Sequence, residues 1–219
     1  MLSRDPQASW DAAAFVPYWD PALRGRRYRR FVKRLMTVGL VGFTSIAKGR
    51  VGLFTVGKKN GDLRLIVDAR GPNIIFGPPP KVDLASSEAL GRFEIDCQFE
   101  FGEGDELEAC LRQLMVSIGA ADVDNCFHRL RVPRELARYF CLEPVQCGPM
   151  GLAGTIIDDV EKGWDDWVYP MWLSAPMGFR WSLYLAQEGG ENVLSGTSSL
   201  AVVPFIHDRS EPLVIDRQY

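Results

Sequence analysis

The chain has 219 residues, of which 47% are hydrophobic and 24% are charged. This composition is ordinary for a globular protein and argues against wholesale disorder. No apolar run reaches the roughly 18 residues that a membrane-spanning helix needs, and residues 1–10 lack the apolar core of a secretory signal. We therefore expect an intracellular protein with no membrane partner, and the sequence leaves nucleus and cytoplasm open.

The cysteine pattern argues against disulfides and against zinc. There are five cysteines, an odd number, and none forms a CxxC pair. Without a secretory signal this pattern indicates reduced thiols. The only histidines, His128 and His207, do not stand at ligand spacing from a cysteine, so no zinc site is expected.

Charge is distributed unevenly along the chain. Residues 1–75 contain 14 Lys and Arg against 5 Asp and Glu, whereas the remainder contains 11 against 23. A basic segment of this kind is typical of a surface that contacts phosphates. A solvated basic helix or arm is the alternative, and charge alone does not separate the two.

The first elements in chain order are an arm, a helix and a hairpin. Residues 1–20 predict an irregular arm, and residues 21–35 predict an amphipathic helix whose polar face is almost all Arg and Lys, ended by glycines 39 and 42. Residues 51–56 and 63–67 are β-rich runs joined by a turn that contains Asn60-Gly61, a strong hairpin signal.

Mixed elements follow the hairpin. Residues 71–81 predict a proline-rich loop, residues 103–114 a helix, and the segment from residue 118 a short apolar strand. Further along we expect a short helix after Pro133, a strand at 139–142, an exposed loop or insertion at about 147–167, and a helix at about 179–187. Helices and strands mix without regular βαβ alternation, which predicts an α+β fold.

The candidate chemistry begins in the segment ADVDNCFHRLRV, residues 121–132. Asp122 ends a predicted apolar strand and could offer a carboxylate oxygen to Mg²⁺. Phe127, five residues on, could lie beneath a bound sugar. Taken alone, this pattern also fits a turn with solvated carboxylates.

Two companion segments sharpen the interpretation. Upstream stands KKNGDLRLIVDARGPN (58–73), and downstream stands APMGFRWSLYLAQ (175–187). Three such segments in this order resemble the reverse transcriptases of retroelements, whose fingers hairpin, first palm motif and L-P-x-G turn have similar patterns. The resemblance covers residues 58–187 and implies a partial right-hand polymerase fold, fingers plus incomplete palm. The divisions it implies are an arm and basic helix at 1–35, a fingers-like region at 36–117 and a partial palm-like region at 118–219.

The resemblance also implies roles for individual residues. Lys58 or Lys59 would close with Arg64 on the triphosphate of an incoming deoxynucleotide. Asp122 and the carbonyl of Val123 would bind Mg²⁺, and Phe127 would exclude a 2′-hydroxyl. Pro176, Met177 and Gly178 would shape the surface under the templating base pair, while Asp68, Arg70 and Asn73 would anchor the fingers and touch the template backbone. An equally good alternative for Asp68 is a purely structural role.

One family element is not found in the sequence. Two-metal phosphoryl transfer needs further carboxylates, which the family supplies from an (F/Y)-x-D-D hairpin after the Pro-x-Gly turn. Residues 188–219 contain no such pattern, and the doublet Asp158-Asp159 precedes the turn. We therefore expect no polymerase turnover from this chain alone.

Three hypotheses follow from the sequence. The first is a fragment of a retroelement reverse transcriptase that is inactive alone, and whose implied partners are an RNA or DNA template-primer and deoxynucleoside triphosphates. The second is a non-catalytic nucleic-acid-binding module, in which the basic helix with Arg26, Arg27 and Arg30 contacts phosphates. The third is a remnant that never folds to a single state.

Overall fold

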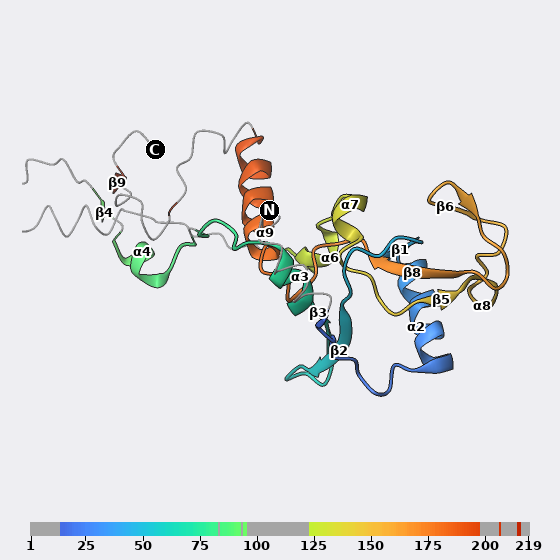
Figure 1. The fold of residues 1–219 in the computed structure, drawn as a ribbon. Helices are drawn as coiled ribbons and strands as arrows, with labels where there is room; N and C mark the ends of the chain where they lie inside the picture. The colour runs from blue at the N-terminus through green and yellow to red at the C-terminus, as the bar shows by residue number, and fades with distance from the viewer. Residues whose placement is uncertain are drawn as a thin grey trace, which may run out of the picture. The chain divides into compact units, whose positions relative to one another are not determined.

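A computed structural model describes residues 14–82, 84–92, 94–95, 123–197, 206 and 214–215. The chain divides into two compact units, residues 1–80 with 125–189 and residues 81–124 with 190–219. Each unit is described by itself. Helices and small sheets are mixed, so the predicted α+β class is confirmed (Figure 1). In the described residues no helix is both long enough and apolar enough to cross a membrane.

The basic segment forms a helix, as predicted, although it begins later. Helix α2 (Gly25–Thr37) buries Tyr28, Val32 and Leu35 along one face. Gly39 ends it in the left-handed region (φ 70°), where the N–H of Leu40 reaches back to the carbonyl of Leu35. Gly42, also predicted to break the helix, instead lies in the following strand.

A three-stranded antiparallel sheet lies beside α2 (Figure 1). Its strands are β1 (Val41–Thr44), β8 (Trp167–Trp172) and β5 (Val145–Gln146), with β8 in the centre. Val41 pairs with Trp172, so the sheet joins a segment predicted as fingers-like to one predicted as palm-like. Trp172, Phe140 and Val168 are fully buried around this sheet. Their burial supplies much of the apolar area that stabilises the unit.

The predicted hairpin is confirmed. Strands β2 (Gly52–Gly57) and β3 (Leu63–Asp68) pair over their whole length. Leu53 and Val67 at its base are buried, whereas the tip is exposed. Gly61 in the turn has φ 86°, which explains the Asn-Gly signal.

Helix α3 (Arg70–Ile75) corrects the predicted loop at 71–81. Pro72 is the third residue of this helix, where its missing N–H would have had no intrahelical partner. Only the stretch that follows, residues 77–82, lacks regular structure. The proline-rich composition of this segment therefore predicted a loop where a short helix forms, because Pro72 stands at the start of the helix.

The segment between the hairpin and β8 contains short elements only. Helix α6 (Cys126–Arg129) follows Asn125, and helix α7 (Arg134–Ala137) begins directly after Pro133, as predicted. The predicted strand at 139–142 is wrong. Cys141 alone forms bridges there, to Arg50 and to Met171, because a turn precedes it and Pro144 follows closely.

The predicted exposed insertion at 147–167 is only partly correct. Helix α8 (Cys147–Met150) is buried against the core, and strands β6 (Ile156–Ile157) and β7 (Val160–Glu161) form a small hairpin. The Trp164 ring lies against Gly148, where an added Cβ would come within 2.4 Å of it. The exposed part is therefore the turn after α8, the hairpin and the loop that follows it, whereas α8 itself is largely buried.

The remaining elements are helix α9 and the short elements of the second unit. Helix α9 (Ser182–Ser195) starts three residues later than predicted and runs past the predicted end at Gln187. In the second unit, α4 (Ser87–Gly91) begins with a Ser86 cap, and β4 (Glu94–Ile95) pairs in parallel with β9 (Val214–Ile215). The helix predicted at 103–114 and the strand residues 118–122 lie outside the described residues.

Candidate nucleotide and nucleic-acid site

The hairpin tip presents three cations to solvent. Lys58 and Lys59 stand in the turn, and Arg64 opposes Val56 on the return strand. They border an open hollow of about 490 Å³ whose wall also includes Gly57 and Asn60. All three side chains are exposed, and within the described residues none is paired with a carboxylate. The tip is therefore free to contact phosphate oxygens.

Asp68 has a structural role at the hairpin base. Its carboxylate is 3% exposed and accepts hydrogen bonds from the backbone N–H of Tyr18, at 2.7 Å, and from Nε and Nη2 of Arg70, both at 2.8 Å. The hydrogen bond from Arg70 holds the pKa of Asp68 below its ordinary value, although burial acts in the opposite direction. The structural alternative for Asp68 is thus the one that the geometry favours.

Arg70 is oriented by the same ion pair. Its guanidinium lies over the Phe15 ring, 5.0 Å from the centroid, and its side chain remains 65% exposed. Two of its N–H groups are used by Asp68, and the rest face outward from a fixed position. The predicted contact of Arg70 with a template stays a prediction, now with the side chain held in place.

Asn73 connects two motif segments that are far apart in sequence. Its Nδ2 donates to the carbonyl of Gly178 at 2.9 Å, and its Oδ1 accepts from the backbone N–H of Arg180 at 2.9 Å. The N–H of Val67 also donates to the carbonyl of Met177, at 3.3 Å. The Pro-x-Gly turn is thereby fastened to the hairpin. Asn73 holds protein backbone in the structure, which leaves its predicted template contact as a prediction.

Gly178 could not be replaced without movement. Its φ is 118°, and a Cβ at this position would lie 2.5 Å from the carbonyl oxygen of Val67. Glycine is therefore required both by backbone conformation and by the close approach of β3. A small cavity of about 290 Å³ lies here, lined among others by Tyr18, Asp68, Arg70 and Gly178.

The predicted metal ligands are not brought together in the described structure. Asp122 lies outside the described residues, Val123 is exposed, and Phe127 is half-buried in α6. Within the described ranges, no group of three or more His, Cys, Asp or Glu side chains could hold a metal ion. The described part does not provide a Mg²⁺ site, so we derive no step through the metal.

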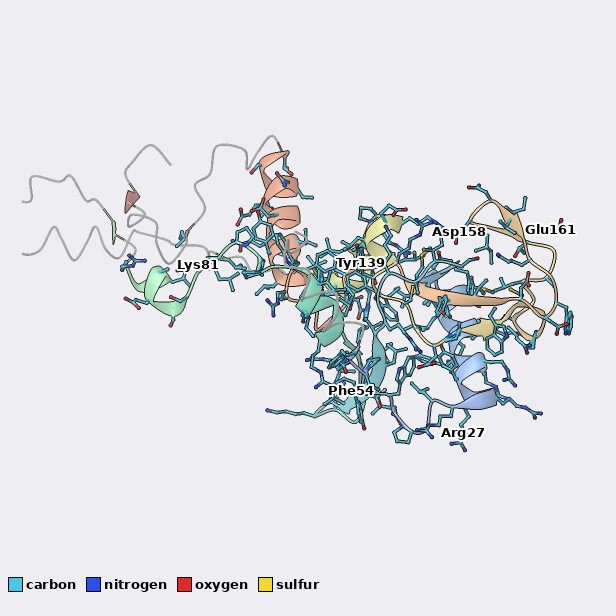
Figure 2. All side chains as sticks on the ribbon, in the orientation of Figure 1. Arg27, Phe54, Lys81, Tyr139, Asp158 and Glu161 are labelled. Atoms are coloured by element: carbon cyan, nitrogen blue, oxygen red, sulfur yellow. The ribbon has the colours of Figure 1, made fainter. Side chains whose placement is uncertain are left out.

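An acidic group that the sequence reading set aside stands at the tip of the β6–β7 hairpin (Figure 2). Asp158 and Asp159 form a two-residue turn in which both φ angles are positive, 50° and 64°. The carboxylate of Asp158 accepts from Thr44 Oγ1 at 2.8 Å and from the N–H of Ser45 at 2.6 Å. In the sequence, the adjacent pair Asp158-Asp159 was the only feature that could have indicated this acidic group.

Two arginines complete the surroundings of Asp158. Nη2 of Arg134 lies 2.8 Å and Nη2 of Arg138 lies 2.9 Å from its Oδ1. Burial raises the pKa of Asp158, but the hydrogen bonds from Arg134, Ser45, Thr44 and Arg138 outweigh it, and the pKa falls below the ordinary value. Four hydrogen bonds occupy the lone pairs of the Asp158 carboxylate that a metal would need, so Asp158 serves structure.

The basic helix is exposed where the sequence predicted phosphate contacts. Arg26, Arg27 and Arg30 all face solvent, and Figure 2 shows Arg27 pointing outward from α2. Helix α2 has no acidic residue in its first turn and no ion pair among the described residues. The helix therefore keeps its full positive charge.

Comparison with known proteins adds no assignment. The chain matches no protein-family model. A search of curated proteins likewise finds no significant match.

Proposed function

We propose that this chain contains the fingers and part of the palm of an RNA-directed DNA polymerase. The observation that carries the proposal is the fastening of the Pro-x-Gly turn to helix α3 by Asn73 and to strand β3 by Val67. Two segments that resemble reverse transcriptase motifs are separated by about a hundred residues, yet they share hydrogen bonds around one small cavity. If the two sequence patterns had arisen by coincidence, their segments would not be expected to contact each other.

The roles of the site residues in this proposal are those that the resemblance implies. Lys59, helped by Lys58, and Arg64 bind the triphosphate from the hairpin tip. Met177 and Gly178 lie under the templating base pair, and Arg70 extends from the hairpin base toward the template. By the same resemblance, Asp122 and Val123 would contribute oxygens to Mg²⁺, and Phe127 would select deoxynucleotides by its bulk.

The test is formation of a ternary complex. A labelled template-primer is titrated with the protein in Mg²⁺, and the matching deoxynucleoside triphosphate is compared with a mismatched one. The matching nucleotide should slow dissociation of the parent complex, and Arg64→Gln should remove this effect. Lys81→Gln removes an exposed charge from the second unit and serves as the matched control. Equal dissociation with matching and mismatched nucleotides would contradict the proposal.

Primer extension provides a second, independent readout. We expect no extension from the parent chain or from Asp122→Ala, since Asp122 is the only palm carboxylate that the resemblance assigns. Extension by the parent that Asp122→Ala abolishes would instead establish catalysis by the chain as it stands. Both proteins must first be shown to fold, by their melting transitions.

A second candidate function is nucleic-acid binding without chemistry. The observation that favours it is the unneutralised charge of α2 described above. Affinity for nucleic acid would then fall steeply with salt and would not respond to nucleotide. The ternary-complex experiment separates the two functions, because only the polymerase requires discrimination between nucleotides.

A further inference from the structure

A second cavity, of about 410 Å³, lies in the first unit between the N-terminal arm, α2 and the β5–α8 segment. Its wall includes three aromatic side chains, those of Trp19, Tyr28 and Trp167. The neighbouring arm residue Tyr18 lines the other cavity, beside Arg70 and Gly178. The arm thus contributes successive aromatic residues to two separate cavities.

The aromatic wall is held in place. The rings of Trp19 and Tyr28 meet edge to face, with centroids 5.5 Å apart. The Tyr28 hydroxyl donates to the carbonyl oxygen of Glu143 at 2.6 Å, which fixes the ring at the back of the cavity. Trp167 stands at the opening with 58% of its surface exposed. A flat ligand would meet aromatic surfaces that need no rearrangement.

The polar groups around this cavity favour an anionic, hydrogen-bonding ligand. Arg24 and Arg29 line it, and both are exposed. The one acidic residue in the wall, Glu143, is paired with Arg50 at 2.5 Å and is therefore neutralised.

The charge on α2 extends this site along the surface. Seven cations lie in and just before the helix, all exposed, and among the described residues none pairs with a carboxylate: Arg24, Arg26, Arg27, Arg29, Arg30, Lys33 and Arg34. Several stand four residues apart, where like charges repel and weaken an isolated helix. A chain of phosphates lying along the helix would relieve this repulsion, whereas an uncharged peptide would not.

We propose that this cavity takes one base of a single-stranded nucleic acid whose backbone follows α2. Stacking on aromatic rings together with arginine contacts to phosphate is the arrangement that single strands use and duplexes, whose bases are already stacked, do not. The inference rests on the nucleic-acid binding that the proposed function requires. It assigns a site distinct from the hairpin tip and from the Pro-x-Gly turn.

The experiment measures binding of a labelled single-stranded oligonucleotide to the full chain by fluorescence anisotropy, with no primer and no nucleotide. The same sequence as a duplex and an abasic oligomer of equal length are compared. We expect the single strand to bind best and the abasic oligomer to lose affinity. Trp167→Ala should weaken single-strand binding about 5- to 150-fold, the range that corresponds to the loss of one stacked base.

Matched variants separate the cavity from the charge. Ile156→Ala removes an exposed apolar side chain from the β6–β7 hairpin that does not line the cavity, and should bind like the parent. Trp167→Phe should restore most of the affinity. Trp167→Ala should leave the salt dependence of binding unchanged. The double variant Arg27→Gln with Arg30→Gln should reduce the slope of log affinity against log salt concentration, because only the double variant loses phosphate contacts.

Each outcome decides the proposal. Two results would overturn the base site: single-strand binding that Trp167→Ala does not weaken, or a duplex and an abasic oligomer that bind as tightly as the intact single strand. Either result would leave the charge of α2 as the whole basis of nucleic-acid binding. Quenching of tryptophan fluorescence by a proline-rich peptide but not by the oligonucleotide would also overturn the base site. Neither result touches the ternary-complex test with Arg64→Gln, so failure of this site is distinguishable from failure of the polymerase proposal.

Discussion

Gly52 lies so close to Tyr18 that a Cβ on Gly52 would stand 1.8 Å from the Tyr18 carbonyl oxygen. Two hydrogen bonds hold the arm here: the N–H of Tyr18 donates to Asp68, and the N–H of Asp20 donates to the carbonyl of Leu53 at 2.9 Å. The arm is therefore packed onto the hairpin base by backbone contact, and this contact requires glycine.

We predict that Gly52→Ala will displace the arm and destabilise the first unit. Overpacking of this kind costs about 1–3 kcal/mol, and it should appear as a lower urea midpoint. Gly57→Ala is the matched control, because it lies on the same strand and nothing would stand within 4 Å of its new Cβ. Equal midpoints for the two variants would contradict the packing of the arm.

A second glycine pair separates backbone strain from close contact. Gly178→Ala should cost more than Gly61→Ala, since both have positive φ but only Gly178 also meets a carbonyl oxygen, that of Val67. A residue other than glycine in the left-handed region costs roughly 1–3 kcal/mol of stability. The additional loss for Gly178→Ala over Gly61→Ala therefore measures the clash with the Val67 carbonyl oxygen. Thermal melting of both variants gives the comparison. An equal loss at the two positions would show that the turn can move away from β3.

The Asp158 cluster predicts a pH dependence. Because the folded pKa of Asp158 is lowered, its contribution to stability is present above the unfolded value of about 4 and is lost as the pH falls below it. Asp158→Asn should cost roughly 2–3 kcal/mol at pH 7, discounted because Arg134 is half-exposed. The cost should shrink as the pH is lowered below about 4.

Urea unfolding at pH 7 and at pH 3 checks this prediction. Asp159→Asn is the control, since this exposed neighbour shares the turn, the positive φ and the carboxylate but makes no ion pair among the described residues. A loss for Asp158→Asn that is the same at both pH values would show that the carboxylate charge does not contribute.

Thiol reactivity should follow burial. Cys141 and Cys147 are buried, and burial raises the pKa of both thiols, that of Cys141 to about 12. Cys126 is partly exposed. In the native protein at pH 8 we expect iodoacetamide to modify Cys126 much faster than the other two, as measured by mass spectrometry of the peptides. Comparable rates would mean that the core opens readily on the time scale of labelling.

The local features were the ones that the sequence predicted well. The hairpin follows from Asn60-Gly61 between β-rich runs, and α2 from its apolar period, because both signals lie within a few residues. Helix α3 was missed because residues 71–81 were taken together as one proline-rich loop, although Pro72 occupies the first turn of a helix, where its missing N–H has no intrahelical partner to lose.

The non-local features could not be predicted in the same way. The Asp158 cluster gathers Thr44, Arg134 and Arg138, which no spacing rule connects. The pairing of β1 with β8 likewise depends on the whole fold. The hydrogen bond from Asn73 to Gly178 was not predicted, because the resemblance implied for Asn73 only that it anchors the fingers and touches the template backbone.

The central position of β8 has a consequence for synthesis of the protein on the ribosome. Both edge strands, β1 and β5, take their main-chain partners from β8, the last of the three strands to be made. Val41 must therefore leave the exit tunnel long before Trp172 does, and its edge stays unpaired meanwhile. Nascent chains stalled before residue 167 should bind chaperones that recognise exposed strands, and chains stalled well beyond residue 172 should release them.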